Sequence, residues 1–211
     1  MTDAWDRMTP ERQRGLIRVA AAEFASAGYQ GASLNAIIRR CGLSKSSFYY
    51  VVPGKRELYD LVIRELSADL AGRIRIPRPE DLAGPAFWPE LEALFDRLLA
   101  AAAEDEGSTA LGRMIYGPGP GPGEAAGTTW TGIEGWIGEV LRVGRESGEV
   151  RDDLPPALQR RLVFAVLRAM DEWSLTEADP GSTELGTVAR AQYDAIRRLL
   201  RNESEKSGTS P

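Results

Sequence analysis

Hydroxyl and ammonium groups are concentrated in one short stretch of the chain that begins just after Gly42. The stretch contains Ser44, Lys45, Ser46, Ser47, Tyr49 and Tyr50, and Lys55 follows it. Ser44 is a typical helix N-cap residue, so Lys45 to Ser47 would lie in a first helical turn, where unpaired backbone N–H groups attract anions. Such a set of donors suits phosphate oxygens and the edges of nucleobases.

The residues that other chemistries need are missing. The 211 residues include no histidine and a single cysteine, Cys41. A histidine-dependent metal site and Ser-His-Asp hydrolysis are therefore excluded, and we expect no metal, no cofactor and no catalytic residue. Cys41 is predicted to be a small core residue, and a redox-sensing thiol is the alternative.

A glycine-rich segment offers the one argument for an enzyme. Residues 117–123 alternate glycine with proline. A phosphate-binding loop works through consecutive backbone N–H donors and a following lysine, but here proline removes every second donor and the lysine is absent. We therefore predict a loop at 117–123 and a protein that is not an enzyme.

The charge is divided unequally along the chain. The whole chain carries a net charge of −5, but residues 1–56 contain nine Lys and Arg against four acids, which gives +5 there and leaves −10 for the remainder. A basic segment followed by an acidic one suits a protein that meets a polyanion with one end only. No apolar run approaches the roughly 18 residues of a membrane span, and no signal peptide is evident, so we expect a cytoplasmic protein.

Helical periodicity dominates and predicts an all-α fold of about nine helices. The predicted helices cover approximately 9–28, 33–42, 44–53, 54–76, 87–104, 108–115, 128–147, 155–177 and 182–203. In the first of them, one apolar stripe is formed by Leu16, Ile17, Ala20, Ala21 and Phe24. The second and third helices are short and are separated by a tight turn at Gly42, which is the pattern of a helix-turn-helix.

The run from Gly42 to Leu58, with Gly31-Ala-Ser33 upstream, resembles the recognition-helix signature of the tetracycline-repressor (TetR) family over about residues 9–60. The resemblance implies a DNA-binding regulator in which Tyr49 contacts a phosphate and Ser33 and Lys55 hold the DNA backbone. The DNA-binding residues predicted in all are Ser33, Ser44, Lys45, Ser46, Ser47, Tyr49, Tyr50 and Lys55. Of the two tyrosines, one is expected to pack while the other donates.

Three residues depart from the family pattern. Val51 replaces a frequent histidine or tyrosine, Val52 a packing phenylalanine, and Ile38 a small residue between the helices. The first two of these give some support to the alternative function, a helical adaptor dimer of the same fold that has lost DNA binding.

The last two helices carry apolar stripes too wide for one face, which predicts that they are buried both within the chain and against a second copy. The predicted dimer residues are Leu158, Leu162, Ala165, Ala169, Leu185, Val188, Ala189, Gln192, Ile196 and Leu199. Two DNA-binding segments in a homodimer would recognise a palindromic operator.

Large aromatic and sulfur-containing side chains after residue 87 suggest a cavity for an apolar ligand. The candidates are Trp88, Phe95, Met114, Trp130, Trp136, Phe164, Met170 and Trp173. We therefore predict three segments: a helix-turn-helix DNA-binding domain at 1–56, a helical ligand-binding and dimerisation domain at 57–203, and a disordered tail at 204–211. The expected function is a repressor that a small hydrophobic effector releases from its operator.

Overall fold

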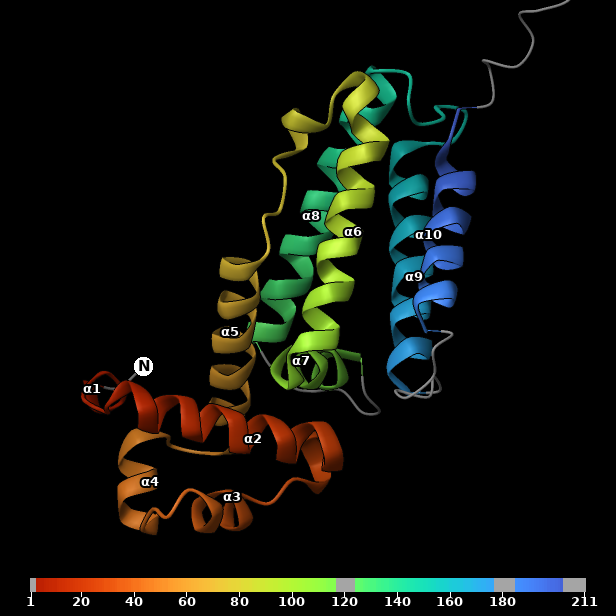
Figure 1. Cartoon of the computed structure of the whole chain (residues 1–211). Coiled ribbons are helices and arrows are strands. Elements are labelled where there is room, and N and C mark those ends of the chain that lie inside the picture. Colours follow the sequence, from red (N-terminus) through yellow and green to blue (C-terminus); the bar gives the residue numbers. More distant parts are fainter. Residues whose placement is uncertain (1–2, 117–123, 177–184, 203–211) are drawn as a thin grey trace, which may run out of the picture. The chain divides into compact units, whose positions relative to one another are not determined.

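The computed structural model describes residues 3–116, 124–176 and 185–202, and nearly all of these residues are helical (Figure 1). In order, the elements are α1 (Asp3–Asp6), α2 (Pro10–Gly31), α3 (Leu34–Arg40), α4 (Lys45–Val51), α5 (Lys55–Arg73), the 3-10 turns η1 (Pro79–Leu82) and η2 (Gly84–Ala86), α6 (Phe87–Glu104), α7 (Glu106–Tyr116), α8 (Glu124–Glu146), α9 (Pro156–Thr176) and α10 (Leu185–Leu200). Within the described ranges the only β pairing is one isolated bridge between Val150 and Arg201. The predicted all-α class is confirmed.

All nine predicted helices are present, as α2 to α10, and only α1 and the two 3-10 turns were not predicted. The predicted loop at 117–123 and the predicted tail at 204–211 lie outside the described residues. No described helix is long and apolar enough to span a membrane.

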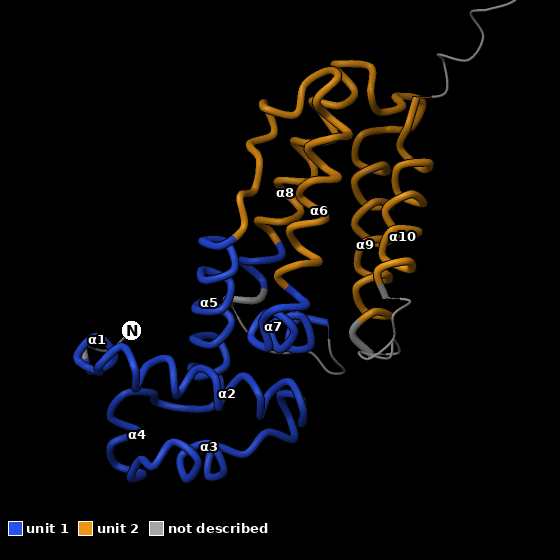
Figure 2. The backbone as a smooth tube through the Cα atoms, in the orientation of Figure 1, with its two compact units in different colours: residues 1–73, 102–130 blue, residues 74–101, 131–211 orange. Residues whose placement is uncertain are grey.

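The chain divides into two compact units (Figure 2). Unit 1 contains residues 1–73 and 102–130, and unit 2 contains residues 74–101 and 131–211. Unit 1 thus includes α5 and α7 in addition to the basic segment. The boundary predicted after residue 56 separates two functions and stays a prediction.

The long helix α2 carries the core of unit 1. Its five predicted apolar residues, Leu16 to Phe24, are all buried. Thr9 occupies the N-cap position and Pro10 the first turn, but the Thr9 side chain makes no capping hydrogen bond. Gly28, the predicted end, does leave the helical conformation with φ +67°, although the helix resumes as far as Gly31.

Helices α5 and α7 complete unit 1 and pack against α2 and against each other. The buried hydroxyl of Tyr59 on α5 donates to the carbonyl of Met114 on α7 at 2.6 Å. Burial is the main cause that raises the pKa of Tyr59 to about 12. This hydrogen bond stabilises the contact between α5 and α7, because a buried phenol hydroxyl without a partner would lose its hydration without compensation.

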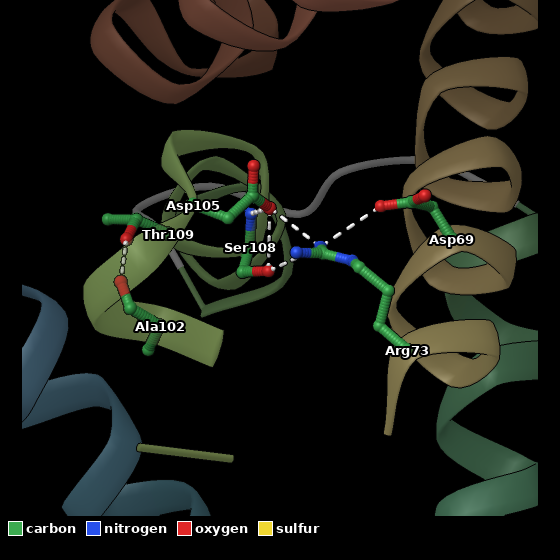
Figure 3. Close-up of polar contacts among 6 residues, drawn as sticks. All are labelled: Asp69, Arg73, Ala102, Asp105, Ser108 and Thr109. Carbon is green, nitrogen blue, oxygen red and sulfur yellow. Dashed lines mark hydrogen bonds and ion pairs between the residues drawn. The ribbon is translucent and has the colours of Figure 1, made fainter. Parts of the chain in front are cut away.

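A polar network joins the end of α5 to the start of α7 (Figure 3). Arg73 reaches Asp69 at 3.0 Å and Asp105 at 2.7 Å, and Asp105 accepts hydrogen bonds from the backbone N–H and the hydroxyl of Ser108, both at 2.8 Å. Partial burial alone would raise the pKa of Asp105, but the hydrogen bonds from Ser108 and Arg73 outweigh it and lower the pKa to about 2. Asp105 therefore acts as the N-cap of α7 in its charged form.

Unit 2 is held mainly by apolar contacts among α6, α8, α9 and α10. Its core contains Leu82, Phe87, Trp88, Ile137, Val140, Leu141, Val150, Val163 and Leu200. The backbone of Gly144 on α8 lies so near Phe87 and Val150 that a Cβ atom there would come within 2.6 Å of both side chains. Helices α9 and α10 lie side by side (Figure 1), and Tyr193 on α10 donates to the carbonyl of Trp88 at 3.0 Å.

Candidate nucleic-acid interface

Helices α3 and α4 form a helix-turn-helix whose ends are fixed by local hydrogen bonds. Ser33 caps α3 by accepting from the backbone N–H of Ala36 at 3.3 Å. At the other end of α3, Gly42 takes φ +65°, and the N–H of Leu43 donates to the carbonyl of Ile38 at 3.1 Å. This is a Schellman motif, and it requires the left-handed conformation that glycine adopts without strain.

The start of α4 presents a cluster of three serine hydroxyls. Ser44 caps the helix by accepting from the N–H of Ser47 at 3.1 Å. Its hydroxyl also lies 3.0 Å from that of Ser46 and 2.8 Å from that of Ser47. All three serines and Lys45 are exposed, so the positive end of the helix dipole, the hydroxyls and one ammonium group share one surface.

Further along α4, the side chains divide into one core residue and two exposed ones. Phe48 is fully buried. Tyr49 is 47% exposed and packs edge-on against Phe48, and Tyr50 is 66% exposed. Both tyrosines are exposed, so the expectation that one packs while the other donates stays a prediction.

Glu23 on α2 connects both ends of α3 and was not predicted. Its carboxylate accepts from the backbone N–H of Ser33 at 3.0 Å and forms an ion pair with Arg40 at 3.7 Å. The Ser33 hydroxyl accepts from Ala36 and keeps its own proton for another acceptor. The sequence signal that could have pointed to Glu23 is an acid next to Phe24 of the apolar stripe, in a helix that also carries three arginines.

Lys55, at the start of α5, makes contacts within the chain. Its ammonium group donates to the carbonyl of Gln30 at 2.9 Å and lies 5.1 Å from the ring centroid of Tyr29. These contacts hold the end of α2, beyond Gly28, against the start of α5. The predicted phosphate contact by Lys55 stays a prediction, and the structure adds this positioning role.

The departures at Ile38 and Val52 lie inside unit 1, where both side chains are buried. Val51 is half-buried. Cys41 is a half-buried free thiol, and burial raises its pKa although Arg40 opposes the rise. A raised pKa disfavours the reactive thiolate, so the core interpretation of Cys41 remains the better one.

The helix-turn-helix matches a known protein family. Residues 16–62 match the family "Bacterial regulatory proteins, tetR family". Residues 16–62 are therefore a tetR-family segment. Its helix-turn-helix is the DNA-binding domain of that family. No curated protein matched the sequence.

Solved structures share the fold over nearly the whole chain at low sequence identity. A TetR family transcriptional regulator from Chloroflexus aurantiacus has 18% identity and a TM-score of 0.68, with 96% of this chain and 99% of that chain covered. SmeT, the repressor of the Stenotrophomonas maltophilia multidrug efflux pump SmeDEF, has 17% identity and a TM-score of 0.69, with 98% of both chains covered. The ketosteroid transcriptional regulator KstR2 of Mycobacterium tuberculosis has 20% identity and a TM-score of 0.63, with 93% and 98% covered.

The dimer residues predicted for this regulator lie in two environments within unit 2. On α9, the predicted residues Leu158, Leu162, Ala165 and Ala169 are all exposed, and Trp173 extends their stripe. On α10, Val188, Gln192, Ile196 and Leu199 are half-buried, whereas Ala189 is buried within the chain. Gln192 donates to Ser174 at 3.2 Å. Leu185 begins α10.

The residues predicted to line an effector pocket are divided between the units. Met114 is buried in unit 1, where Trp130 packs edge-on against Tyr116. The other six belong to unit 2: Trp88 is buried, Phe95 packs on Tyr193, Trp136 donates to the carbonyl of Pro77, Phe164 and Met170 are half-buried, and Trp173 is exposed. The effector pocket stays a prediction.

Proposed function

We propose that this regulator is a homodimeric repressor that binds a palindromic operator through α4 and leaves it when a small hydrophobic effector binds. The observation that carries the proposal is the exposed polar start of α4, held in place by the caps at Ser33 and Ser44 within a segment of net charge +5. A recognition helix needs such a tip, because base edges are read by side chains near its N-terminus.

The proposed contacts fall into two classes. Lys45, Ser46 and Tyr50 are exposed on α4 and are the candidates for base edges and nearby phosphates. Ser33, Ser44, Ser47, Tyr49 and Lys55 are candidates for the DNA backbone, which positions the protein without reading sequence. Since Lys55 already donates to Gln30, its replacement would weaken DNA binding in part through the position of α2.

Dimerisation is supported by the apolar stripe on α9. Leu158 is 45% exposed, Leu162 40% and Trp173 39%. Residues spaced by three and four along a helix lie on one face, and an exposed face of this kind is a candidate interface. Two DNA-binding domains are also needed on energetic grounds, because specific sites are bound about 10³ to 10⁷ times more tightly than non-specific DNA.

Release by an apolar effector is supported by the number of aromatic side chains in unit 2. Two proteins of the same fold are named as the repressor of a multidrug efflux pump and as a ketosteroid regulator. An effector must bind more tightly to the form that does not fit the operator, with a coupling of about 1–3 kcal/mol.

The DNA-binding step is tested by selecting duplexes from a random pool with the full chain. We expect recovery of a palindrome whose half-sites lie about 34–36 Å apart or a multiple of that. A Lys45→Ala/Tyr49→Ala/Tyr50→Ala variant should no longer bind that duplex, while Arg14→Ala, which changes an exposed arginine paired with Glu11, should still bind it. Enrichment of no duplex at low salt would instead support the adaptor alternative.

The effector step is tested on the selected duplex by adding apolar compounds of graded size. Release by a compound that does not lower the thermal stability of the protein supports the proposal. If compounds bind unit 2 but none of them changes DNA affinity, the regulator does not respond to such ligands in the way proposed.

A further inference from the structure

A groove in unit 1 lies between the first half of α2 and the α3–α4 turn, outside the surface assigned to DNA. Its volume is about 290 Å³. The residues that line it are Met8, Glu11, Arg12, Gly15, Leu16, Arg18, Val19, Arg40, Cys41, Gly42 and Leu43. The turn side of the groove is firm, because the Schellman hydrogen bond from Leu43 to Ile38 fixes its backbone.

The rim of the groove is cationic. It carries three arginines, Arg12, Arg18 and Arg40, against the single acid Glu11. Arg12 and Arg18 form no ion pair with any residue that the structure describes, and Arg40 has only its 3.7 Å pair with Glu23. Glu11 in turn lies 3.6 Å from Arg14, which does not line the groove. The lining therefore keeps unneutralised positive charge.

The floor of the groove is apolar. Leu16 is buried, and Met8, Val19 and Leu43 are half-buried residues that pack against the core of unit 1. A site with an apolar floor and a few convergent charged groups is typical of small-molecule binding. Its volume lies at the small end of the range for ligand pockets, about 300–1,000 Å³.

Gly15 lines the groove without a side chain and so leaves room in it. It lies inside α2, where glycine is less favourable than alanine by about 0.5–1 kcal/mol. Its backbone has no positive φ, and a Cβ atom placed on it would meet nothing within 4 Å. Neither the backbone conformation nor the packing requires glycine here, and any longer side chain would project into the groove.

We propose that this groove binds a small organic anion, a carboxylate with a flat apolar body, whose charged group contacts Arg12, Arg18 and Arg40. The apolar body would lie over Leu16 and Val19, and the absence of a side chain at Gly15 leaves the room for it. Hydrogen bonds between guanidinium and carboxylate are charge-assisted and are among the stronger ones in proteins. The DNA backbone could also contact the arginines of the rim, but it has no apolar group to bind the floor.

Binding here would act on the DNA-binding domain directly. The ligand would bridge α2 and the turn that sets the start of α4, and it would neutralise part of the basic segment. The loss of positive charge lowers affinity for a polyanion. This goes beyond the effector step proposed above, because it places a second ligand in unit 1. The binding itself does not depend on the proposed operator.

The test is calorimetric titration of the full chain, without DNA, with 1-naphthoate and with its neutral isostere 1-naphthamide. We expect the acid to bind at least tenfold more tightly than the amide. Gly15→Leu should abolish acid binding by filling the groove, whereas Gly15→Ala should retain it within about twofold, since one methyl group meets nothing there. Arg12→Ala/Arg18→Ala should weaken binding at least tenfold, and Arg14→Ala should leave it unchanged.

The paired variants separate the groove from other sites. If acid binding survives Gly15→Leu in protein with unchanged circular dichroism, the acid binds elsewhere and the proposal is wrong. Should Gly15→Leu fail to fold, the arginine pair against Arg14→Ala decides the question. If no acid binds, and Arg12→Ala/Arg18→Ala instead lowers DNA affinity and its salt dependence, the groove is a DNA contact and the proposal is overturned. Loss of operator binding alone would bear only on the proposed function.

Discussion

The two units hold their helices together in different ways. In unit 1, polar groups fix the ends of short helices: Ser33 and Ser44 cap α3 and α4, Glu23 joins α2 to α3, and Asp105 caps α7. In unit 2, helices are held by side-chain packing, with Phe87 against the backbone of Gly144, and by the ion pairs of Arg190 on α10 with Glu92 and Asp96 on α6. A capping hydrogen bond fixes the direction in which a helix starts. Close packing of side chains fixes the distance between two helices.

The units also differ in what they leave exposed. On α4 of unit 1 the exposed large side chains are tyrosines, which carry hydroxyls, whereas on α9 of unit 2 they are Leu158, Leu162 and Trp173. The polar groups at the start of α4 are hydrated when exposed and can exchange that water for phosphate. The apolar stripe on α9 is favourable only when a partner covers it. This difference supports the proposals that unit 1 binds DNA and that unit 2 binds a second copy of the chain.

The largest expected effect comes from charging the apolar stripe. Leu162→Glu would place a carboxylate in the proposed interface, where an unpaired buried charge is strongly unfavourable. We expect a monomer by sedimentation and a decrease in operator affinity of about 10³-fold, toward the level of non-specific binding.

Ala157→Glu is the matched control for this change, because Ala157 is also exposed on α9 but lies off the stripe. It should remain dimeric and keep its affinity. A Leu162→Glu protein that still dimerises would show that α9 is an ordinary solvent-facing helix, and the difference between the two surfaces would have no meaning.

The next effect is on the polar tip of α4. Lys45→Ala should weaken operator binding by about 30- to 150-fold for two half-sites, because each charge-assisted contact contributes about 1–1.5 kcal/mol net. If Lys45 binds phosphate, the slope of log affinity against log salt should become shallower by about 0.9 for each phosphate that the variant no longer neutralises.

Fluorescence anisotropy at several salt concentrations measures both quantities for Lys45→Ala. Arg113→Ala, which removes an exposed arginine from α7 in the same unit, is the control. Equal decreases in affinity for the two variants would mean that charge in general, and not the tip of α4, determines the affinity.

The sequence predicted the features that act over a few residues. The cap at Ser44, the start of α3 at Ser33, the turn at Gly42 and the break at Gly28 each depend on local backbone chemistry, and each is found. Thr9 is the exception among the caps, because its side chain takes part in a hydrogen bond with Glu11, which together with backbone hydrogen bonds lowers the pKa of that carboxylate.

Contacts between residues distant in the chain could not be predicted in this way. The carboxylate of Glu23 reaches the backbone of Ser33, and the ammonium of Lys55 reaches the carbonyl of Gln30. Periodicity gives the face on which a residue lies but not the partner that it meets. For the same reason it could not show that α7 packs against α2. The stripe on α9 could be predicted, since it depends on spacing alone, but burial of Ala189 within the chain could not.

A third prediction concerns packing in unit 2. Gly144→Ala would bring a methyl group to within 2.6 Å of Phe87 and Val150, so we expect a decrease of about 2 kcal/mol in the free energy of unfolding. Gly132→Ala, on the same helix but with nothing within 4 Å, should instead stabilise by about 0.5–1 kcal/mol. Denaturant melts give both values. Similar values for the two variants would indicate that close packing does not hold α8 in place.

The smallest expected effect is a pH dependence of stability that unit 1 shows and unit 2 does not. The folded-state pKa of Asp105 is about 2, below its ordinary value of 3.8, so its charged form stabilises unit 1 fully above about pH 4, and this contribution disappears as the pH falls toward 2. After allowance for solvent screening at this partly exposed group, we expect roughly 1 kcal/mol. Asp105→Asn should remove most of that pH dependence, because a neutral amide cannot pair with Arg73 as the carboxylate does. Hydrogen exchange of the amides in α7 measures it between about pH 2 and 5, with the amides of α10 as the reference. If acid opens α10 as much as α7 in the parent protein, polar capping does not distinguish unit 1 from unit 2.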